Sequence, residues 1–224
     1  MEFTITLVLV IITCLVSIGG FSNQKVIDDL IFHPPSISHR NQYYRFITHG
    51  LIHADFIHLA FNMLALYSFG EVLEVQLFND ECIFGSNGKI FFILLYLGGL
   101  IVASIPDYIR YRNNYQFRSL GASGAVCGVV FAAVVLLPKS GVGFAFIPGI
   151  TIPGYLFAVL YLAYCIYLDK KDNSRINHSA HLWGSLFGLV FTIVFVTVFG
   201  HINIWENFME QLKASKPFLP ACDL

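Results

Sequence analysis

Two apolar stretches of this chain each carry one side chain that can take part in acyl transfer. Ser123 lies in the tetrapeptide GASG (121–124), and His181 follows Ala180 near the start of the other stretch. A serine hydroxyl is a weak nucleophile that needs an adjacent general base. A neutral imidazole can accept the hydroxyl proton and later donate it to a leaving amine. The pair therefore predicts a nucleophile, Ser123, and a general base, His181, in apolar surroundings.

A third apolar stretch carries two hydrogen-bond donors. His58 and Asn62 are four residues apart, so both side chains lie on one face of a helix. Both can donate hydrogen bonds to the oxyanion that forms during acyl transfer. The alternative is a polar contact between helices, worth about 1 kcal/mol.

Small residues surround both the serine and the histidine. Gly121 and Gly124 flank the serine, and Ala180, Gly184 and Gly188 recur at intervals of four. Small residues at this interval form a smooth strip that lets two helix backbones approach closely. We expect the strip to meet the glycines beside the serine and to bring the imidazole to the hydroxyl. Helix packing without catalysis is the alternative for a lone GxSG pattern.

Histidines and cysteines raise the question of a metal site. His49, His53 and His58 are spaced so that some could share a ligand set, but HGLIH (49–53) lacks the glutamate of a HExxH site. The cysteines form no CxxC pair and are predicted to be small buried hydrophobic residues, without a disulfide framework or a zinc site. We therefore predict no metal and no cofactor. The five cysteines are Cys14, Cys82, Cys127, Cys165 and Cys222.

No carboxylate is obviously placed to orient the imidazole of His181. Asp107 falls in the third predicted loop and Asp169 in the fifth, while Glu71 and Glu74 lie toward the far end of the second apolar stretch. A Ser–His dyad is therefore expected instead of a triad, with only a nucleophile and a base.

The composition indicates a membrane protein. Of 224 residues, 56% are hydrophobic and only 12% are charged, and the mean hydropathy is +0.69. A soluble domain carries about twice this charged fraction. The net charge of −1 provides no basic surface for nucleic acid. The predicted fold class is all-α, a polytopic membrane protein.

Six apolar stretches can be drawn as spans. In hydrocarbon every backbone polar group must be paired within its own segment, so each stretch is predicted to be a helix. The first has no basic region before it and is expected to be a retained helix instead of a signal peptide. We expect one domain over 1–224, with a first loop at about 19–55 and a C-terminal tail at about 201–224. The stretches are Phe3–Ile18, Phe56–Val75, Ile90–Ile105, Leu120–Leu137, Phe144–Leu168 and Ala180–Phe199.

The second, fourth and sixth stretches run in the same direction if all six cross the membrane. His58, Asn62, Ser123 and His181 lie near the starts of these three stretches, so they are expected at one membrane face. The loops on that face carry more Lys and Arg than the loops on the other. The positive-inside rule would therefore place that face in the cytoplasm.

Together these residues resemble the rhomboid family of intramembrane serine proteases. The resemblance runs from Tyr44 to Gly188 and includes Tyr44-Arg45, HxxxxHxxxN (53–62), GASG (121–124) and AHxxGxxxG (180–188). It implies a six-helix bundle of the bacterial type, with Ser123 as the nucleophile and His181 as the base. The oxyanion hole would consist of the two donors at 58 and 62 and the Ser123 backbone N–H.

The resemblance also implies supporting roles and a location. Arg45 and His53 would be structural residues of the first loop, and Glu74 would tie the first loop or the sixth helix through hydrogen bonds. The family's site lies in a water-filled cavity that opens to the extracytoplasmic side, here of a bacterial inner membrane. The fifth helix and the loop from Asp169 to Asn177 would form a mobile gate.

Two positions depart from the family pattern. The family's Trp-Arg in the first loop is Tyr44-Arg45 here, which is a mild change. Many bacterial members have an aromatic residue four positions after the serine, against which the imidazole packs, but here this residue is Cys127. Two outcomes are open: His181 is held less firmly, or another aromatic residue such as Tyr164 or Trp183 replaces the missing ring.

The expected substrates are transmembrane helices of other proteins, weakened near the cut by Gly or Pro. They would reach the site between the second and fifth helices. Two other functions stay open at this point. The first is a catalytically silent relative that binds and escorts membrane helices, for which the Ser, His and Asn set has no use. The second is a metal or proton transporter, which usually needs more intramembrane carboxylates than Glu71 and Glu74.

Overall fold

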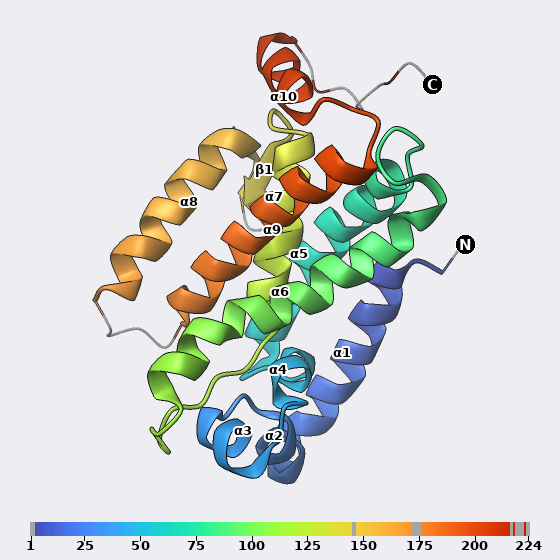
Figure 1. Cartoon of the computed structure of the whole chain (residues 1–224). Helices are drawn as coiled ribbons and strands as arrows, with labels where there is room; N and C mark the ends of the chain where they lie inside the picture. The colour runs from blue at the N-terminus through green and yellow to red at the C-terminus, as the bar shows by residue number, and fades with distance from the viewer. Residues whose placement is uncertain (1–2, 145–146, 172–175, 216, 218–221, 223–224) are drawn as a thin grey trace.

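The computed structural model describes residues 3–144, 147–171, 176–215, 217 and 222. Within them the chain is mostly helical, with one short β-hairpin (Figure 1). The helices are α1 (Ile5–Phe21), α2 (Gln24–Leu30), α3 (Pro34–Arg40), α4 (Arg45–Thr48), α5 (Phe56–Glu71), α6 (Gly88–Tyr111), α7 (Ser123–Leu136), α8 (Gly154–Asp169), α9 (His178–Phe199) and α10 (Ile204–Lys213). Short 3₁₀ turns cover His49–Leu51 and Gly85–Asn87, a π-helix covers Val72–Phe78, and the strands are β1 (Gly141–Phe144) and β2 (Ile147–Pro153).

The six predicted apolar stretches correspond to six helices of unequal length. Among the described residues, three helical segments are long and apolar enough to cross a membrane: Phe56–Phe78, Gly85–Tyr111 and His178–Phe199. The other three, α1, α7 and α8, are shorter apolar helices. Large apolar side chains such as Phe56, Val159 and Val198 are more than 60% exposed. So many exposed apolar side chains are typical of a surface that faces lipid.

The prediction of a continuous helix from Phe144 to Leu168 was wrong at its start. An antiparallel hairpin precedes the helix, with Gly141 paired with Pro153 and Val142 with Ile152, and α8 begins only at Gly154. Prolines at 148 and 153 provide no backbone N–H for a helix. The β-branched residues between them favour a strand. Hydrophobicity alone does not distinguish these two structures.

Helices α7 and α9 form the centre of the bundle, and their backbones touch. A Cβ atom at Gly184 would lie 2.0 Å from the carbonyl oxygen of Gly124, and one at Gly188 would lie 2.1 Å from that of Gly128. Both helices carry these glycines four residues apart, so the contact repeats on successive turns. This close approach brings the first turns of α7 and α9 together.

The first loop folds as its own cluster of short helices, α2 to α4, at one end of the bundle (Figure 1). Arg45 is buried beneath it, and its guanidinium donates to the carbonyl oxygens of Asp28 (2.9 Å) and Ile31 (2.7 Å) and to Gln42 Oε1 (2.7 Å). A buried arginine therefore ties α2 to the segment before α4.

Glu74 anchors a different element from the one expected. It lies in the π-helix after α5, fully buried, and its carboxylate accepts hydrogen bonds from Ile5 N (2.7 Å), Thr6 N (2.8 Å) and Thr6 Oγ1 (2.8 Å). The prediction that Glu74 ties the first loop or the sixth helix was wrong. The free N–H groups at the start of α1 and its positive dipole end are suited to an anion.

The prediction that no cysteine forms a disulfide was also wrong. Cys82, which follows the π-helix, is bonded to Cys222 in the tail, and their Cα atoms are 5.5 Å apart. The bond joins positions separated by 140 residues, a pairing that local sequence spacing does not reveal. Cys14, Cys127 and Cys165 have free thiols, and Cys165 is buried, as predicted for a small hydrophobic residue.

Candidate active site

Ser123 and His181 lie within hydrogen-bonding distance of each other. Ser123 is the first residue of α7 and His181 lies in the first turn of α9, and the His181 Nε2 atom is 2.8 Å from Ser123 Oγ. Both residues line a cavity of about 830 Å³ at the same end of the bundle as the first loop. The arrangement can transfer a proton directly from the hydroxyl to the imidazole.

The turn before α7 is held by the first loop. Gly121 N donates to the carbonyl oxygen of His49 (2.9 Å), and Ala122 N donates to His53 Nε2 (3.4 Å). Gly121 adopts φ +112°, and a Cβ there would lie 2.7 Å from Cε1 of His58. Only glycine combines this backbone conformation with such a close ring contact.

The hydrogen-bond network assigns the tautomer of His53. The Ser17 hydroxyl donates to Leu51 O (2.8 Å), so its contact of 3.0 Å with His53 Nδ1 must be a hydrogen bond that Nδ1–H donates. Nε2 is then unprotonated and accepts from Ala122 N. Burial, with the neighbouring His58 and His49, lowers the pKa of His53 to about 3. The ring therefore stays neutral near pH 7, as this acceptor role requires.

His49 has a similar structural role. Ser104 on α6 donates to Leu100 O (2.9 Å), so His49 Nε2–H donates to Ser104 Oγ (3.1 Å). Burial lowers the pKa of His49 to about 4, which keeps this ring neutral. His49 and His53 therefore position the backbone next to Ser123 and do not form a shared ligand set with His58.

His58 and Asn62 also line the cavity that contains Ser123. Asn62 is buried, and its Nδ2 donates one hydrogen bond to His58 O (2.9 Å) on its own helix. An amide nitrogen has two N–H groups, so one donor is left for another acceptor. Both side chains come from the first turns of α5, as the sequence pattern predicts.

A tyrosine that the sequence did not single out contacts the second nitrogen of His181. Tyr161 on α8 places its hydroxyl 3.1 Å from His181 Nδ1, and the two rings are stacked. The expectation of Tyr164 or Trp183 was wrong, since Tyr164 contacts His178 instead and Trp183 is 43% exposed. The sequence of α8 contains four tyrosines, and no local spacing distinguishes Tyr161 from the other three.

The two contacts of the Tyr161 hydroxyl permit the direction of proton donation that a base at His181 needs. Its hydroxyl is also 3.2 Å from the sulfur of Cys127, the residue that replaces the expected aromatic. If Tyr161 donates to this sulfur, it accepts from His181 Nδ1–H, and His181 Nε2 is free to accept from Ser123. A cysteine at 127 therefore leaves room for a tyrosine from α8 to hold the imidazole.

Asp107 was expected in a loop but lies buried on α6, where it holds the start of α9. Its Oδ2 accepts from Asn177 Nδ2 (2.5 Å). Asn177 in turn caps α9, since its Oδ1 accepts from Ala180 N (2.9 Å). No carboxylate within the described residues contacts the imidazole of His181 directly. The predicted gate at Asp169–Asn177 falls partly outside the described residues, at 172–175.

Comparison with known proteins identifies the family. The sequence model of the Rhomboid domain matches residues 40–198, which include every motif described above. The bacterial protein named "Putative rhomboid protease YdcA" from Bacillus subtilis is 32% identical over 145 residues, which are 64% of this chain and 62% of that protein.

Mitochondrial proteins are also similar. The human "Presenilin-associated rhomboid-like protein, mitochondrial" is 28% identical over 160 residues, covering 69% of this chain and 37% of that protein. "RHOMBOID-like protein 12, mitochondrial" from Arabidopsis thaliana is 27% identical over 154 residues, covering 62% of this chain and 42% of that protein. The chain therefore spans less than two thirds of the length of each of these relatives.

Proposed function

Because the chain belongs to the rhomboid family and is a multi-pass membrane protein, we propose that it is an intramembrane serine endopeptidase with a Ser123–His181 dyad. The observation that carries this proposal is the distance of 2.8 Å between Ser123 Oγ and His181 Nε2, inside an apolar bundle. A pair of helices that only needs to pack has no use for this contact.

The proposed reaction begins with attack of Ser123 Oγ on the carbonyl carbon of the scissile peptide bond. His181 Nε2 takes the hydroxyl proton, and Tyr161 keeps the imidazole oriented through Nδ1. The protonated imidazole then donates this proton to the leaving amine. A water molecule from the cavity, activated by the same nitrogen, hydrolyses the acyl-enzyme.

The negative charge on the tetrahedral intermediate needs donors already in place. We assign this role to His58, Asn62 and the Ser123 backbone N–H at the start of α7, all of which border the same cavity. Loss of one such donor typically reduces the rate by about 10²–10³-fold. Gly121, with its positive φ, allows the His58 ring to approach the serine turn.

The proposed substrates are transmembrane helices of other proteins. A helical peptide bond is shielded by its own hydrogen bonds, so cleavage requires a segment that unwinds easily, near Gly or Pro. We propose that such a helix reaches the cavity between α5 and α8, the second and fifth of six spans. α8 lies beside α9 at the edge of the bundle (Figure 1).

The competing proposal is a catalytically silent relative that binds membrane helices. A fluorophosphonate probe distinguishes the two, because it reacts only with an activated serine. We expect wild-type protein to be labelled and Ser123→Ala to be unlabelled, with Ser68→Ala, an exposed serine on α5, as the matched control. Equal absence of labelling in wild type and Ser123→Ala would support the silent relative.

Orientation is a separate part of the proposal, which puts the cavity on the extracytoplasmic side of a bacterial inner membrane. The charge bias of the loops opposes this orientation. The Cys82–Cys222 disulfide at the opposite face also opposes it. The proposed orientation would place this disulfide in the cytoplasm, where the reducing environment makes disulfides rare. In intact cells, an impermeant maleimide should label Tyr115→Cys, an exposed position two residues before Phe117 of the cavity lining, and should label Lys213→Cys only after lysis. The reverse pattern would invert the topology.

Tyr161→Phe tests how the base is positioned. Removal of the hydroxyl deletes its contact with His181 Nδ1 while the stacked ring stays. One hydrogen bond of this kind is worth about 1 kcal/mol, so kcat should fall by about fivefold to tenfold with KM unchanged. Tyr164→Phe, on the same helix and in contact with His178, is the matched control and should retain full activity. Equal rates in both variants would remove Tyr161 from the site.

A further inference from the structure

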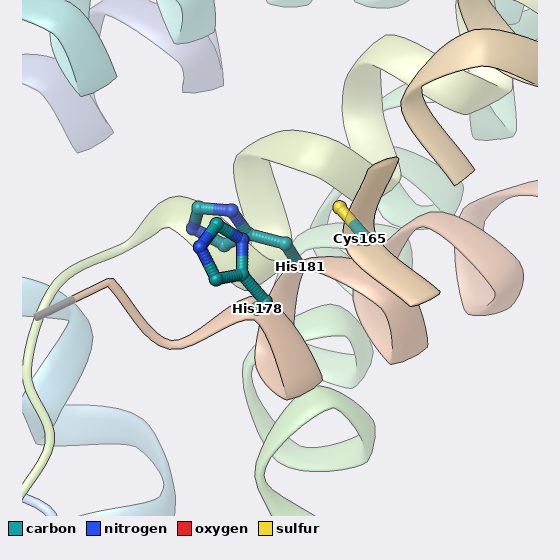
Figure 2. A group of neighbouring side chains, drawn as sticks. All are labelled: Cys165, His178 and His181. Atoms are coloured by element: carbon teal, nitrogen blue, oxygen red, sulfur yellow. The ribbon is translucent and has the colours of Figure 1, made fainter. Parts of the chain in front are cut away.

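Two side chains that the proposed peptide cleavage does not use, Cys165 and His178, form a cluster with His181 of the proposed dyad. His178 and His181 lie three residues apart on α9, and Cys165 lies opposite them on α8 (Figure 2). One ligand atom from each residue lies within 4.8 Å of the other two. Cys165 and His178 are both buried.

His178 provides an independent sign that a ligand is missing. The residue is 5% exposed, and its Nδ1 atom has no hydrogen-bond partner among the residues that the structure describes. Leaving a buried polar atom unpaired costs about 1–3 kcal/mol. An ion bound to this nitrogen would remove that cost.

We propose that Cys165, His178 and His181 bind a zinc ion that reversibly inhibits the enzyme, an inference that rests on the proposed protease function. One thiolate and two imidazoles are a typical zinc ligand set. Zn–S and Zn–N bonds of about 2.3 and 2.0 Å place tetrahedral ligand atoms about 3.5 Å apart. The three side chains therefore need to approach one another by about 1 Å, and water would occupy the fourth position.

The cavity gives the ion a path to the cluster. His178 and His181 both line it, whereas Cys165 is fully buried and does not. An ion from solvent therefore meets the two imidazoles first and the thiol last. The Cys165 thiol must release its proton to become a ligand, so binding releases one proton to solvent.

Binding would inhibit the reaction through the tautomer of His181. Its Nδ1 faces α8, since this atom contacts the Tyr161 hydroxyl, and Cys165 follows Tyr161 by one helical turn. Zinc on Nδ1 displaces that contact and requires the ring proton to move to Nε2. Nε2–H then donates to Ser123 Oγ and cannot accept the hydroxyl proton. The ion thereby converts the base into a donor.

Cobalt(II) tests the site without any need for activity. Purified full-length protein is stripped with a chelator and titrated with Co²⁺, whose thiolate complexes have a charge-transfer absorption band. We expect this band in wild type and in Cys14→Ser, which removes a free thiol outside the cluster. Cys165→Ser should lack it, and His178→Gln should bind Co²⁺ at least tenfold more weakly. A missing band in wild type, or an unchanged one in Cys165→Ser, overturns the site.

Zinc inhibition tests the regulatory part. Cleavage is measured for each protein with and without Zn²⁺, and the ratio is compared. Zinc should reduce the cleavage rate of wild type and of Cys14→Ser at least tenfold. It should reduce the rate of Cys165→Ser less than twofold. Equal inhibition of wild type and Cys165→Ser, or none in wild type, overturns the inhibitory role. If wild type cleaves nothing without zinc but shows the cobalt band, the protease proposal fails while the metal site stands.

Discussion

Ser123→Ala and His181→Ala are each expected to reduce cleavage of a transmembrane substrate by about 10⁴-fold or more, and the double variant to fall no further. The proposed nucleophile and base would act as a unit, so loss of either would remove the whole covalent pathway. The distance of 2.8 Å between Ser123 Oγ and His181 Nε2 already allows proton transfer between these two side chains. Cleavage of a model substrate in detergent, quantified for all three variants, measures this.

Matched controls separate chemistry from folding. Ser68→Ala removes an exposed serine from α5, and His201→Ala removes an exposed histidine beyond α9, so both should retain wild-type rates. All variants should have the thermal unfolding temperature of the wild type within a few degrees, because neither Ser123 nor His181 is fully buried. Losses in Ser123→Ala and His181→Ala that multiply in the double variant would show that the two residues act independently.

Gly184→Ala is expected to separate α9 from α7 and to lower both stability and activity. The added Cβ would lie 2.0 Å from the carbonyl oxygen of Gly124, and because this neighbour is backbone, the helices themselves must move. A shift of about 1 Å at the first turns of these helices would cost about 10²-fold in rate, since it moves His181 away from Ser123. The thermal unfolding temperature should fall in parallel.

The matched control for this prediction is Gly19→Ala on α1. A Cβ atom there would meet nothing within 4 Å, and alanine is a better helix former than glycine, so stability should be unchanged or slightly higher. Gly188→Ala, whose Cβ would lie 2.1 Å from Gly128 O, should resemble Gly184→Ala in stability. If Gly184→Ala and Gly188→Ala unfold and cleave like the wild type, the described contact between α7 and α9 is wrong.

Much of the fold was predictable because the length and the hydrophobicity of an apolar stretch are local properties of the sequence. The apolar stretches from Phe56 and from Ala180 became α5 and α9 within two residues at their starts. The resemblance to the rhomboid family was confirmed by the match over residues 40–198. The stretch from Phe144 failed, since strand and helix are equally apolar there and only pairing with β1 decides between them.

Contacts between distant segments were the least predictable. Glu74 and Thr6 are 68 residues apart, and Cys82 and Cys222 are 140 apart, so no local spacing links either pair. Tyr161 was missed for the same reason, because which tyrosine of α8 faces His181 depends on the rotation of that helix against α9.

Composition and motifs within single helices were sufficient to predict the membrane class, the family and the identities of the residues that meet in the cavity. The contacts that hold these residues in place could be identified only in the packed bundle. They are Tyr161 against His181, His53 against the serine turn and Asp107 against the cap of α9. Each of these contacts joins two elements whose relative rotation and depth follow from packing of the whole bundle.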